Sequence, residues 1–282
     1  MSSKPQKFTL KLTGPEQGHE VINQLAELTQ LSKGKIKQVI DKGALWYAAS
    51  SDKGVPLNPV RVRRLKVKLY QPGEFHLYYD ELVLFSECPE ATLVEDCGDY
   101  SIWVKPRGML SQGSKWGDHT TLKRFVEKNL KPERPTIIVH RLDKMTRGLM
   151  IVAHNKKAAA SFTRMFENKL IEKSYQAVVS GDTSVLPVSV DTPLDNKTAI
   201  SHVSLVSAHP EGQAVVSVNI ETGRKHQIRR HLSEIDLPVV GDRLYGDGST
   251  ESDLQLDAVE LGFIDPFSGE SKQFSISPEF SG

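Results

Sequence analysis

Residues 138–155, IVHRLDKMTRGLMIVAHN, contain the densest group of side chains that could do chemistry. The group places one carboxylate among basic and hydroxyl side chains: His140, Arg141, Asp143, Lys144, Thr146 and Arg147. If the basic residues near Asp143 along the chain are also near it in space, they favour its ionised form, which suits a nucleophile or a base. A structural ion-pair loop would use the same residue types. The residues alone leave both interpretations open, with a slight preference for catalysis.

A second polar cluster is ETGRKHQIRRHL, residues 221–232, in which Thr222-Gly223 predicts a turn and the remainder a helix. The surrounding quarter of the chain is acidic, yet the cluster keeps four basic residues: Arg224, Lys225, Arg229 and Arg230. Such side chains could hold a phosphate or pair with a catalytic carboxylate. His226 and His231 do not have the i, i+4 spacing of a zinc helix, so we expect hydrogen-bonding roles for them. GDRLYG, residues 241–246, follows as a glycine-bounded turn.

Several reaction classes are excluded because their motifs are missing. A kinase catalytic loop reads H-R-D, but Leu142 intervenes here and no Gly-rich nucleotide loop lies upstream. The chain also lacks a P-loop, a G-x-S-x-G elbow and an H-E-x-x-H zinc helix. Cys88 and Cys97 have no histidine cluster beside them, so we expect ordinary reduced thiols and no metal site.

The elements that must position the first cluster are two apolar runs, TIIV and LMIVA, which predict buried strands with a rigid polar loop between them. Further strand-like pieces are SIWVKP, KSYQAVVS, HVSLVSA and AVVSVNI, and the helix-like pieces are HTTLKRFVEKNL, NKKAAASFTRMFENK and KHQIRRHLSEI. Helices and strands do not alternate regularly. The prediction is therefore an α+β fold with a mixed, largely antiparallel sheet and flanking helices.

The N-terminal segment predicts a separate small module. Residues 18–42 predict two short helices, with Ser32 capping the second and Gly43 ending it, and RVRRLKVKLY, residues 61–70, predicts a basic strand. On the stretch LSKGKIKQVIDKGAL, the segment resembles the αα-β RNA-binding module first seen in a small-subunit ribosomal protein. A longer loop replaces that module's short Val-Asn-Gly turn. The resemblance implies a small α/β RNA-binding module over residues 1–72, and the acidic residues 73–90 predict a strand and linker.

The charge is distributed in blocks, although the formal net charge of the 282 residues is only +1. Residues 1–70 carry a net +8, residues 71–100 a net −8, residues 101–175 a net +10 and residues 176–282 a net −9. Local charge sets the surface field, so two basic blocks can bind a polyanion. No apolar run approaches the ~20 residues of a membrane helix, and no apolar stretch typical of a secretory signal follows the first residues. We therefore expect a cytoplasmic protein that makes no membrane contact.

Four ordered blocks resemble the RluA-type pseudouridine synthase family: HRLDKMTRGLMIVAHN, EKSYQAVVSG, ETGRKHQIRRHL and GDRLYG. VKPRGMLSQG, residues 104–113, resembles that family's upstream Lys-Pro-x-Gly segment. The resemblance covers roughly residues 91–282 and implies that they form the catalytic domain. It implies an isomerase that converts specific uridines in structured RNA to pseudouridine with an aspartate nucleophile and without a cofactor or metal. Ribosomal RNA is slightly favoured over tRNA, because family members that carry such an N-terminal module tend to act on large-subunit ribosomal RNA.

The same resemblance implies roles for single residues. Asp143 matches the catalytic aspartate, and Arg141 matches the arginine that helps to displace the target base from its helix. Tyr175 matches the tyrosine that stacks on the flipped uracil. Arg229 matches the basic residue that pairs with the aspartate, and Ile228 the aliphatic residue beside it.

Three further residues of the matching blocks, His140, Arg224 and Lys105, are predicted to bind the substrate. Arg147 departs from the family pattern, in which serine is usual between Thr146 and Gly148. This departure predicts more basic surroundings for Asp143 and affects the expected substrate preference more than the chemistry.

RNA is the predicted partner, and we expect a monomer without a small-molecule cofactor. One alternative is a non-catalytic RNA-binding or assembly protein, which would use the same basic blocks but need no unique aspartate. Another is a transglycosylase, which would incorporate a free base from solution. Conversion of uridine without a change in mass separates isomerisation from base exchange.

Overall fold

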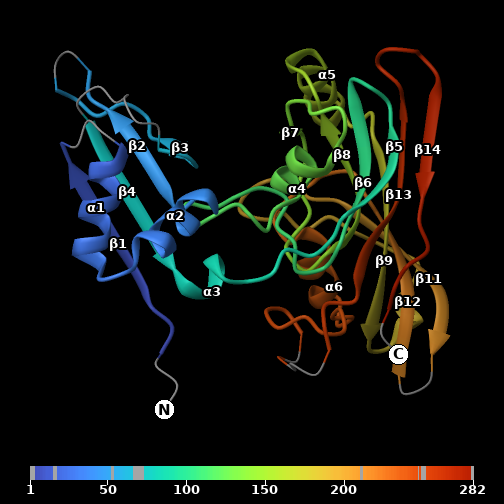
Figure 1. Ribbon diagram of the computed structural model, residues 1–282. Coiled ribbons are helices and arrows are strands. Elements are labelled where there is room, and N and C mark those ends of the chain that lie inside the picture. Colours follow the sequence, from blue (N-terminus) through green and yellow to red (C-terminus); the bar gives the residue numbers. More distant parts are fainter. Residues whose placement is uncertain are drawn as a thin grey trace. The chain divides into compact units, whose positions relative to one another are not determined.

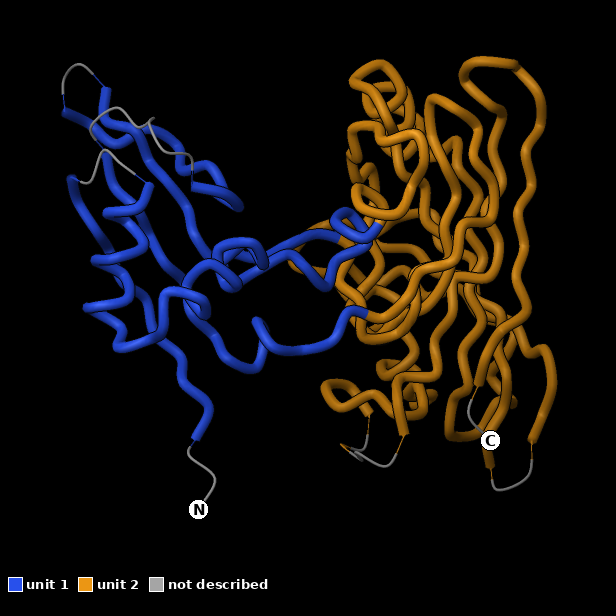
Figure 2. The backbone as a smooth tube through the Cα atoms, in the orientation of Figure 1, with its two compact units in different colours: residues 1–88, 112–125 blue, residues 89–111, 126–282 orange. Residues whose placement is uncertain are grey.

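The computed structural model describes residues 4–14, 18–51, 54–65, 73–209, 212–246, 248 and 252–280. The chain divides into two compact units (Figure 2). Unit 1 comprises residues 1–88 and 112–125, and unit 2 comprises residues 89–111 and 126–282. None of the described helices is long and apolar enough to cross a membrane.

Unit 1 is built on a four-stranded antiparallel sheet in the order β1-β4-β2-β3. Its strands are β1 Lys7–Thr13, β2 Leu45–Ala49, β3 Val60–Val62 and β4 Gly73–Asp80. Two helices, α1 Gly18–Thr29 and α2 Lys33–Asp41, pack on this sheet, and a short helix, α3 Glu81–Leu84, follows β4 (Figure 1). The core joins apolar side chains from the helices and from one side of the strands: Val21, Leu25, Ile36, Val39, Leu45, Phe75 and Leu77.

The two predicted helices of unit 1 are confirmed together with their end signals. The Ser32 Oγ accepts a hydrogen bond from the backbone N–H of Lys35, as expected of an N-cap. Gly43 follows α2 at a φ of +86°, a left-handed conformation that suits glycine. Val21 and Leu25 of α1 are buried, whereas Leu28 is 57% exposed.

The boundaries of unit 1 differ from the predicted ones in two places. Of the acidic residues 73–90, predicted as a strand and a linker, residues 73–80 form the strand β4, which lies inside the sheet of unit 1 between β1 and β2. Residues 112–125, predicted inside the catalytic domain, belong to unit 1. Of the predicted basic strand, β3 contains only the beginning, and Lys66 and Lys68 lie outside the described residues.

Unit 2 contains a ten-stranded sheet with the order β10-β11-β12-β9-β13-β8-β6-β5, to which β14 is added on β13 and β7 on β8. The strands are β5 Thr92–Asp96, β6 Tyr100–Lys105, β7 Ile137–Ile138, β8 Arg147–Ala153, β9 Glu172–Ser180, β10 Val188–Val190, β11 Ser201–His209, β12 Gln213–Ile220, β13 Leu256–Ile264 and β14 Ser271–Ser275. Within the described part of this sheet, β13 and β8 are the one parallel pair. The predicted α+β fold with a largely antiparallel sheet is confirmed.

The helices of unit 2 are α5 Lys156–Glu167 and α6 Gln227–Glu234, and a 3₁₀ turn spans Thr183–Val185. The boundary between the two units at residues 125 and 126 falls within α4 Leu122–Asn129. Phe162 of α5 is fully buried against Tyr100 and Phe263 in the core of the sheet. Three elements of unit 2 carry the polar clusters of the sequence: the loop between β7 and β8, strand β9, and the start of α6.

Candidate active site

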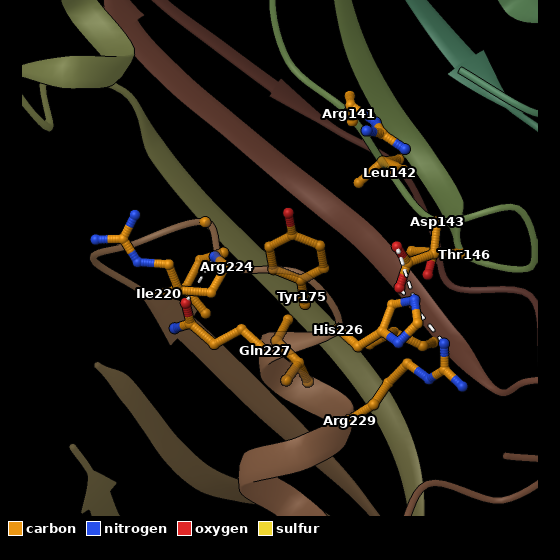
Figure 3. A pocket seen from close by; sticks show the side chains of 13 residues that line it. Arg141, Leu142, Asp143, Thr146, Tyr175, Ile220, Arg224, His226, Gln227 and Arg229 are labelled. Atoms are coloured by element: carbon orange, nitrogen blue, oxygen red, sulfur yellow. Dashed lines mark hydrogen bonds and ion pairs between the residues drawn. The ribbon is translucent and has the colours of Figure 1, made fainter. Parts of the chain in front are cut away.

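A cavity opens in unit 2 where the β7–β8 loop faces β9 and the start of α6 (Figure 3). Nine of the lining side chains come from the two polar clusters of the sequence: Arg141, Leu142, Asp143, Thr146, Arg224, His226, Gln227, Ile228 and Arg229. Three more come from strands β9, β12 and β13: Tyr175, Ile220 and Leu256. The two clusters, about 80 residues apart in the chain, therefore form one site.

Asp143 supplies the carboxylate of this cavity, and 31% of its side chain is exposed. Its Oδ2 lies 3.5 Å from Nη1 of Arg229, and its Oδ1 lies 3.7 Å from Nε2 of His226 (Figure 3). Each oxygen therefore faces a different nitrogen of the α6 segment. A partly exposed carboxylate that is held on one side and open on the other can approach a ligand in the cavity.

The guanidinium of Arg229 is fixed by a second carboxylate. Its Nε and Nη2 donate to the two oxygens of Asp242 at 2.6 Å each, which is a bidentate pair. Asp242 has no exposed side-chain surface and accepts further hydrogen bonds from the backbone N–H groups of Leu244 and Tyr245. Burial opposes its ionisation, but the hydrogen bonds from Arg229 and the backbone outweigh burial and lower the pKa of Asp242. Arg229 thus reaches Asp143 as a preorganised cation.

His226 occupies the N-cap position of α6 with a φ of +55°, which is uncommon for a residue other than glycine. Its Nδ1 lies 3.0 Å from the hydroxyl of Tyr245, and its Nε2 faces Asp143. Burial lowers the pKa of His226, and the neighbouring Arg229 and Lys225 cations lower it further. The Asp143 and Asp242 carboxylates act in the opposite direction but do not outweigh these causes. The neutral imidazole can therefore accept from Tyr245 and present an N–H to Asp143.

The next residue, Gln227, holds the backbone around His226 in place. Its Oε1 accepts from the Thr222 hydroxyl and from the backbone N–H of Arg224, while its Nε2 donates to the Ile200 carbonyl and the Ser201 hydroxyl. Gln227 is only 3% exposed, so all four bonds are shielded from water. A surrounding structure this strongly bonded can sustain the left-handed backbone at His226.

Tyr175 of β9 presents its ring to the cavity, and only 7% of its surface is exposed (Figure 3). Strand β9 lies between β12 and β13, where Tyr175 is opposite Val218 and Ala258. Burial, followed by the nearby Asp143 charge, raises the pKa of the phenol, which keeps it protonated at neutral pH. Ile228 is 5% exposed and adds an apolar wall.

Two predicted arginines stand at the edge of the cavity. Arg141 is exposed and lines the cavity from the β7–β8 loop. Arg224 lines it from the turn before α6, with its Nε donating to the Thr198 carbonyl at 2.8 Å. Both guanidinium groups can therefore meet a polyanionic ligand that enters the cavity.

The structure does not bring two other predicted binding residues into the cavity. Lys105 is fully buried, and its ammonium donates to the carbonyls of Pro106, Met109 and Lys144. Burial lowers the pKa of Lys105 to about 7. His140 accepts the backbone N–H of Ile151 at 2.8 Å, and burial lowers its pKa to about 3, so it stays neutral. Lys105 therefore holds the backbone at Lys144, and His140 holds the backbone at Ile151. The sequence placed both in the cavity because local sequence cannot show which way a side chain turns.

Arg147 does not make the surroundings of Asp143 more basic, contrary to expectation. Its Nη1 donates to Oδ2 of Asp257 at 2.9 Å, and its Nη2 donates to Glu279 at 2.7 Å. Asp257 has no exposed side-chain surface and also accepts from Arg107 at 2.6 Å. The additional cation is therefore paired with the buried carboxylate of Asp257 on β13 and with Glu279 in the C-terminal segment.

Sequence reasoning missed Asp242 and Tyr245 as members of the site. Both lie in GDRLYG, which the sequence indicated only as a turn. The available signal was the single carboxylate directly after Gly241 in a segment already matched to the family. The described residues contain no group of three or more His, Cys, Asp or Glu side chains that could hold a metal ion.

Sequence comparisons relate this chain to RNA pseudouridine synthases. The family model described as RNA pseudouridylate synthase matches residues 99–234. YlyB of Bacillus subtilis, an uncharacterized RNA pseudouridine synthase, is 30% identical over 223 residues, which cover 73% of this chain and 70% of YlyB. The dual-specificity RNA pseudouridine synthase RluA of Vibrio vulnificus is 33% identical over 185 residues, covering 57% of this chain and 73% of RluA.

A solved structure supports the fold independently. Human RNA pseudouridylate synthase domain containing 1 superimposes with a TM-score of 0.58 at 22% sequence identity, covering 68% of this chain and 85% of the human chain.

Proposed function

This chain belongs to the RluA-type family of RNA pseudouridine synthases, which isomerise uridine in RNA to pseudouridine, and we propose that Asp143 is its catalytic carboxylate. The observation that carries the proposal is the position of Asp143 in the cavity, with Arg229 at one oxygen and His226 at the other. Asp143 is the one carboxylate among the described residues that line this cavity.

The reaction breaks the C1′–N1 bond of uridine, turns the uracil and joins C5 to C1′; C5 loses its proton and N1 gains one, so the atoms balance. Asp143 acts as the nucleophile, which splits one difficult displacement into two easier steps. Arg229 orients the carboxylate, and it can do so because Asp242 fixes the Arg229 guanidinium with two hydrogen bonds of 2.6 Å. Substrate and product are isomers, and nothing is oxidised or hydrolysed. The proposed mechanism therefore uses no cofactor and no metal.

The target uridine must leave its stack, which costs a few kcal/mol. The ring of Tyr175 can offset part of this cost, because stacking on an aromatic side chain contributes ~1–3 kcal/mol per base. Arg141, exposed at the edge of the cavity, is proposed to help displace the base, and Arg224 to hold a neighbouring phosphate. Ile228 packs beside the flipped uracil.

Structured RNA is the proposed substrate, with ribosomal RNA ahead of tRNA. The proposed module in the N-terminal residues 1–72 favours ribosomal RNA, and tRNA is the second candidate. We further propose that the protein acts as a monomer in the cytoplasm.

Mapping of pseudouridines in total RNA from cells with and without this protein tests the function. We expect one or a few positions to lose pseudouridine in cells that lack the protein and to regain it when the wild-type gene is returned. If every pseudouridine persists and the purified protein converts no uridine, the protein is an RNA-binding or assembly factor instead.

A further inference from the structure

The sheet of unit 1 has two unlike faces. Along β4, the side chains of Phe75, Leu77 and Tyr79 are buried in the core beneath α1 and α2. The alternate residues point to the opposite face, which α1 and α2 do not cover (Figure 1). That face carries a mixture of aromatic, basic and small polar side chains from all four strands: Lys7, Thr9, Lys11, Trp46, Arg61, His76 and Tyr78.

Residues 112–125, which Figure 2 shows as part of unit 1, bring two more side chains to this face. The Trp116 ring meets the Tyr78 ring edge-on, with centroids 5.9 Å apart. The backbone of this segment is fixed to the strands, because Trp46 Nε1 donates to the Lys115 carbonyl at 3.0 Å and Arg61 Nη2 donates to the Ser114 carbonyl at 2.6 Å. We call this face the sheet platform and define it by Lys7, Lys11, Trp46, Arg61, His76, Tyr78, Lys115 and Trp116.

Aromatic rings on the sheet platform lie side by side as flat surfaces. His76 and Tyr78 are two residues apart on β4, and their rings are 13° from parallel with centroids 6.4 Å apart. Both side chains are partly exposed, His76 by 28%. Aromatic rings that serve only to fill a core are normally buried. The partial exposure of His76 and Tyr78 on the outer face of the sheet therefore indicates another role for these two rings.

Cations accompany these rings. The Lys115 ammonium lies 5.2 Å from the centre of the Tyr78 ring, and the Lys7 ammonium lies 4.5 Å from the centre of the Trp116 ring. The Arg61 guanidinium covers the Trp46 ring at 4.3 Å. Lys7 and Lys11 keep 59% and 55% of their side chains exposed. Rings interleaved with cations are the combination that tracks both the bases and the phosphates of a nucleic-acid strand.

The charge balance of this face is positive. Its carboxylates are engaged by basic neighbours: Glu74 by Lys11, Asp80 by Lys7, and Asp118 by Arg61 and Arg63. Lys115 has no carboxylate partner among the described residues. Five basic side chains thus stand against three acidic ones, which suits an anionic ligand.

We propose that the sheet platform binds unpaired nucleotides of the substrate RNA, with bases stacked on His76 and Tyr78 and phosphates at Lys7, Lys11 and Lys115. This proposal rests on the proposed function, since it assigns a second contact to the same RNA. Unpaired RNA is favoured over a duplex because only splayed bases offer their faces to aromatic rings. It is favoured over an acidic peptide because a peptide would need the cations but not the flat rings.

Binding of a fluorescent single-stranded RNA of mixed sequence to the full-length protein, measured across a salt series, tests the proposal. The Tyr78→Leu variant should bind about tenfold more weakly with an unchanged salt slope, because it removes a stacking surface but no charge. The His76→Ala variant should also bind about tenfold more weakly, because it removes the second stacking surface. The Tyr78→Phe variant keeps the ring and should bind like the wild type. A Lys11→Gln variant should instead reduce the slope by about 0.7 for one lost phosphate contact.

Three outcomes of the experiment would overturn the proposal. If Tyr78→Leu binds RNA like the wild type while Lys33→Gln and Lys37→Gln on the exposed side of α2 weaken binding, RNA docks on the helices and not on the sheet. If Tyr78→Leu weakens duplex and single-stranded RNA equally, the rings do not stack on unpaired bases. If Tyr78→Leu keeps the wild-type affinity for RNA but loses affinity for an acidic peptide, the sheet platform binds a protein partner instead.

Failure here is distinguishable from failure of the proposed function. Binding is measured without turnover, and in the same assay an Asp143→Asn variant should bind RNA within about threefold of the wild type. Uridine conversion at saturating RNA should also remain within about twofold of the wild type in Tyr78→Leu, because the sheet platform is expected to affect KM and not kcat.

Discussion

Each oxygen of the Asp143 carboxylate has its own nitrogen neighbour, and each neighbour is held by a third group. Arg229 is clamped by Asp242, and His226 is bonded to Tyr245. This arrangement orients the carboxylate of Asp143. The sequence identified Asp143 and Arg229 through the family blocks, but the partners that fix Arg229 and His226 emerge only from the folded turn at 241–246.

His226 should control the acid side of the pH profile. Burial lowers its pKa below the usual 6.5, so the imidazole is neutral at pH 7 and becomes cationic only at lower pH. The cation would pair tightly with Asp143 and reduce its nucleophilicity, so kcat/KM of the wild type should fall as pH drops through that pKa. His226→Gln keeps an N–H near the Nε2 position without titrating, and it should retain activity with a flatter acid limb.

His226→Asn is the matched control. Asparagine tolerates the φ of +55° but is too short to reach Asp143, so activity should drop about tenfold at every pH while the fold is kept. Steady-state kinetics between pH 5 and pH 8 read out both variants. An identical acid limb in wild type and His226→Gln would show that His226 does not set the profile.

Asp242 should make the site sensitive to acid. Its folded pKa lies below the unfolded value of about 3.8, so its contribution to stability is present above that value and is lost as pH falls through the folded pKa. Asp242→Asn leaves the Arg229 cation buried without its carboxylate and should lower the free energy of unfolding by about 3 kcal/mol at pH 7. Urea unfolding should show a smaller difference in the free energy of unfolding between wild type and Asp242→Asn at pH 3 than at pH 7. A difference that does not change with pH contradicts the assignment.

At the scale of elements, the loop between β7 and β8 is positioned by contacts that are distant in sequence. The Ser111 hydroxyl donates to the Leu142 carbonyl and accepts the Leu142 N–H, and Lys105 donates to the Lys144 carbonyl. Gly148 allows β8 to approach β13, because a Cβ there would lie 2.3 Å from the Ala258 carbonyl oxygen. Hydrophobic runs predicted the strands on either side of the loop, but β13, which completes the site, was not predicted from its sequence.

Arg147→Ser, which introduces the serine usual in the family, should separate stability from catalysis. The substitution removes one of two arginines from buried Asp257 and releases Glu279, so the free energy of unfolding should fall by about 2 kcal/mol. The Arg147 guanidinium pairs with β13 and the C-terminal segment and not with Asp143, so kcat should stay within about twofold. A large loss of kcat with unchanged stability would mean that Arg147 acts on the substrate.

At the scale of the whole molecule, the sequence predicted two domains but not which segments of the chain belong to each. Local patterns revealed α1 and α2, whereas β1 pairs with β4 across more than sixty residues, and no local signal announces such a pairing. The same limitation hid the membership of residues 112–125 in unit 1. The acidic block at residues 71–100 is likewise divided between the two units. Its strand β4 lies in the sheet of unit 1, together with the basic strands β1 and β3.

The charge blocks predict a salt dependence that the net charge of +1 conceals. If the basic side chains of both units contact phosphates, log Kd should change with log salt by at least about 2, equivalent to about three contacts at about 0.7 each. Fluorescence anisotropy of full-length protein with a labelled RNA between low and physiological salt measures the slope. A slope near zero would show that RNA is held almost entirely by uncharged contacts.

The central claim is that Asp143 performs the isomerisation of uridine, and one assay tests it directly. Purified wild-type protein and Asp143→Asn are incubated with RNA from cells that lack the protein, and pseudouridine is counted at each position while RNA affinity is measured in parallel. The wild type should form pseudouridine without a change in RNA mass, and Asp143→Asn should form none while binding RNA within about threefold of the wild type. Pseudouridine formation by Asp143→Asn at the wild-type rate would contradict the assignment of Asp143 as the catalytic carboxylate.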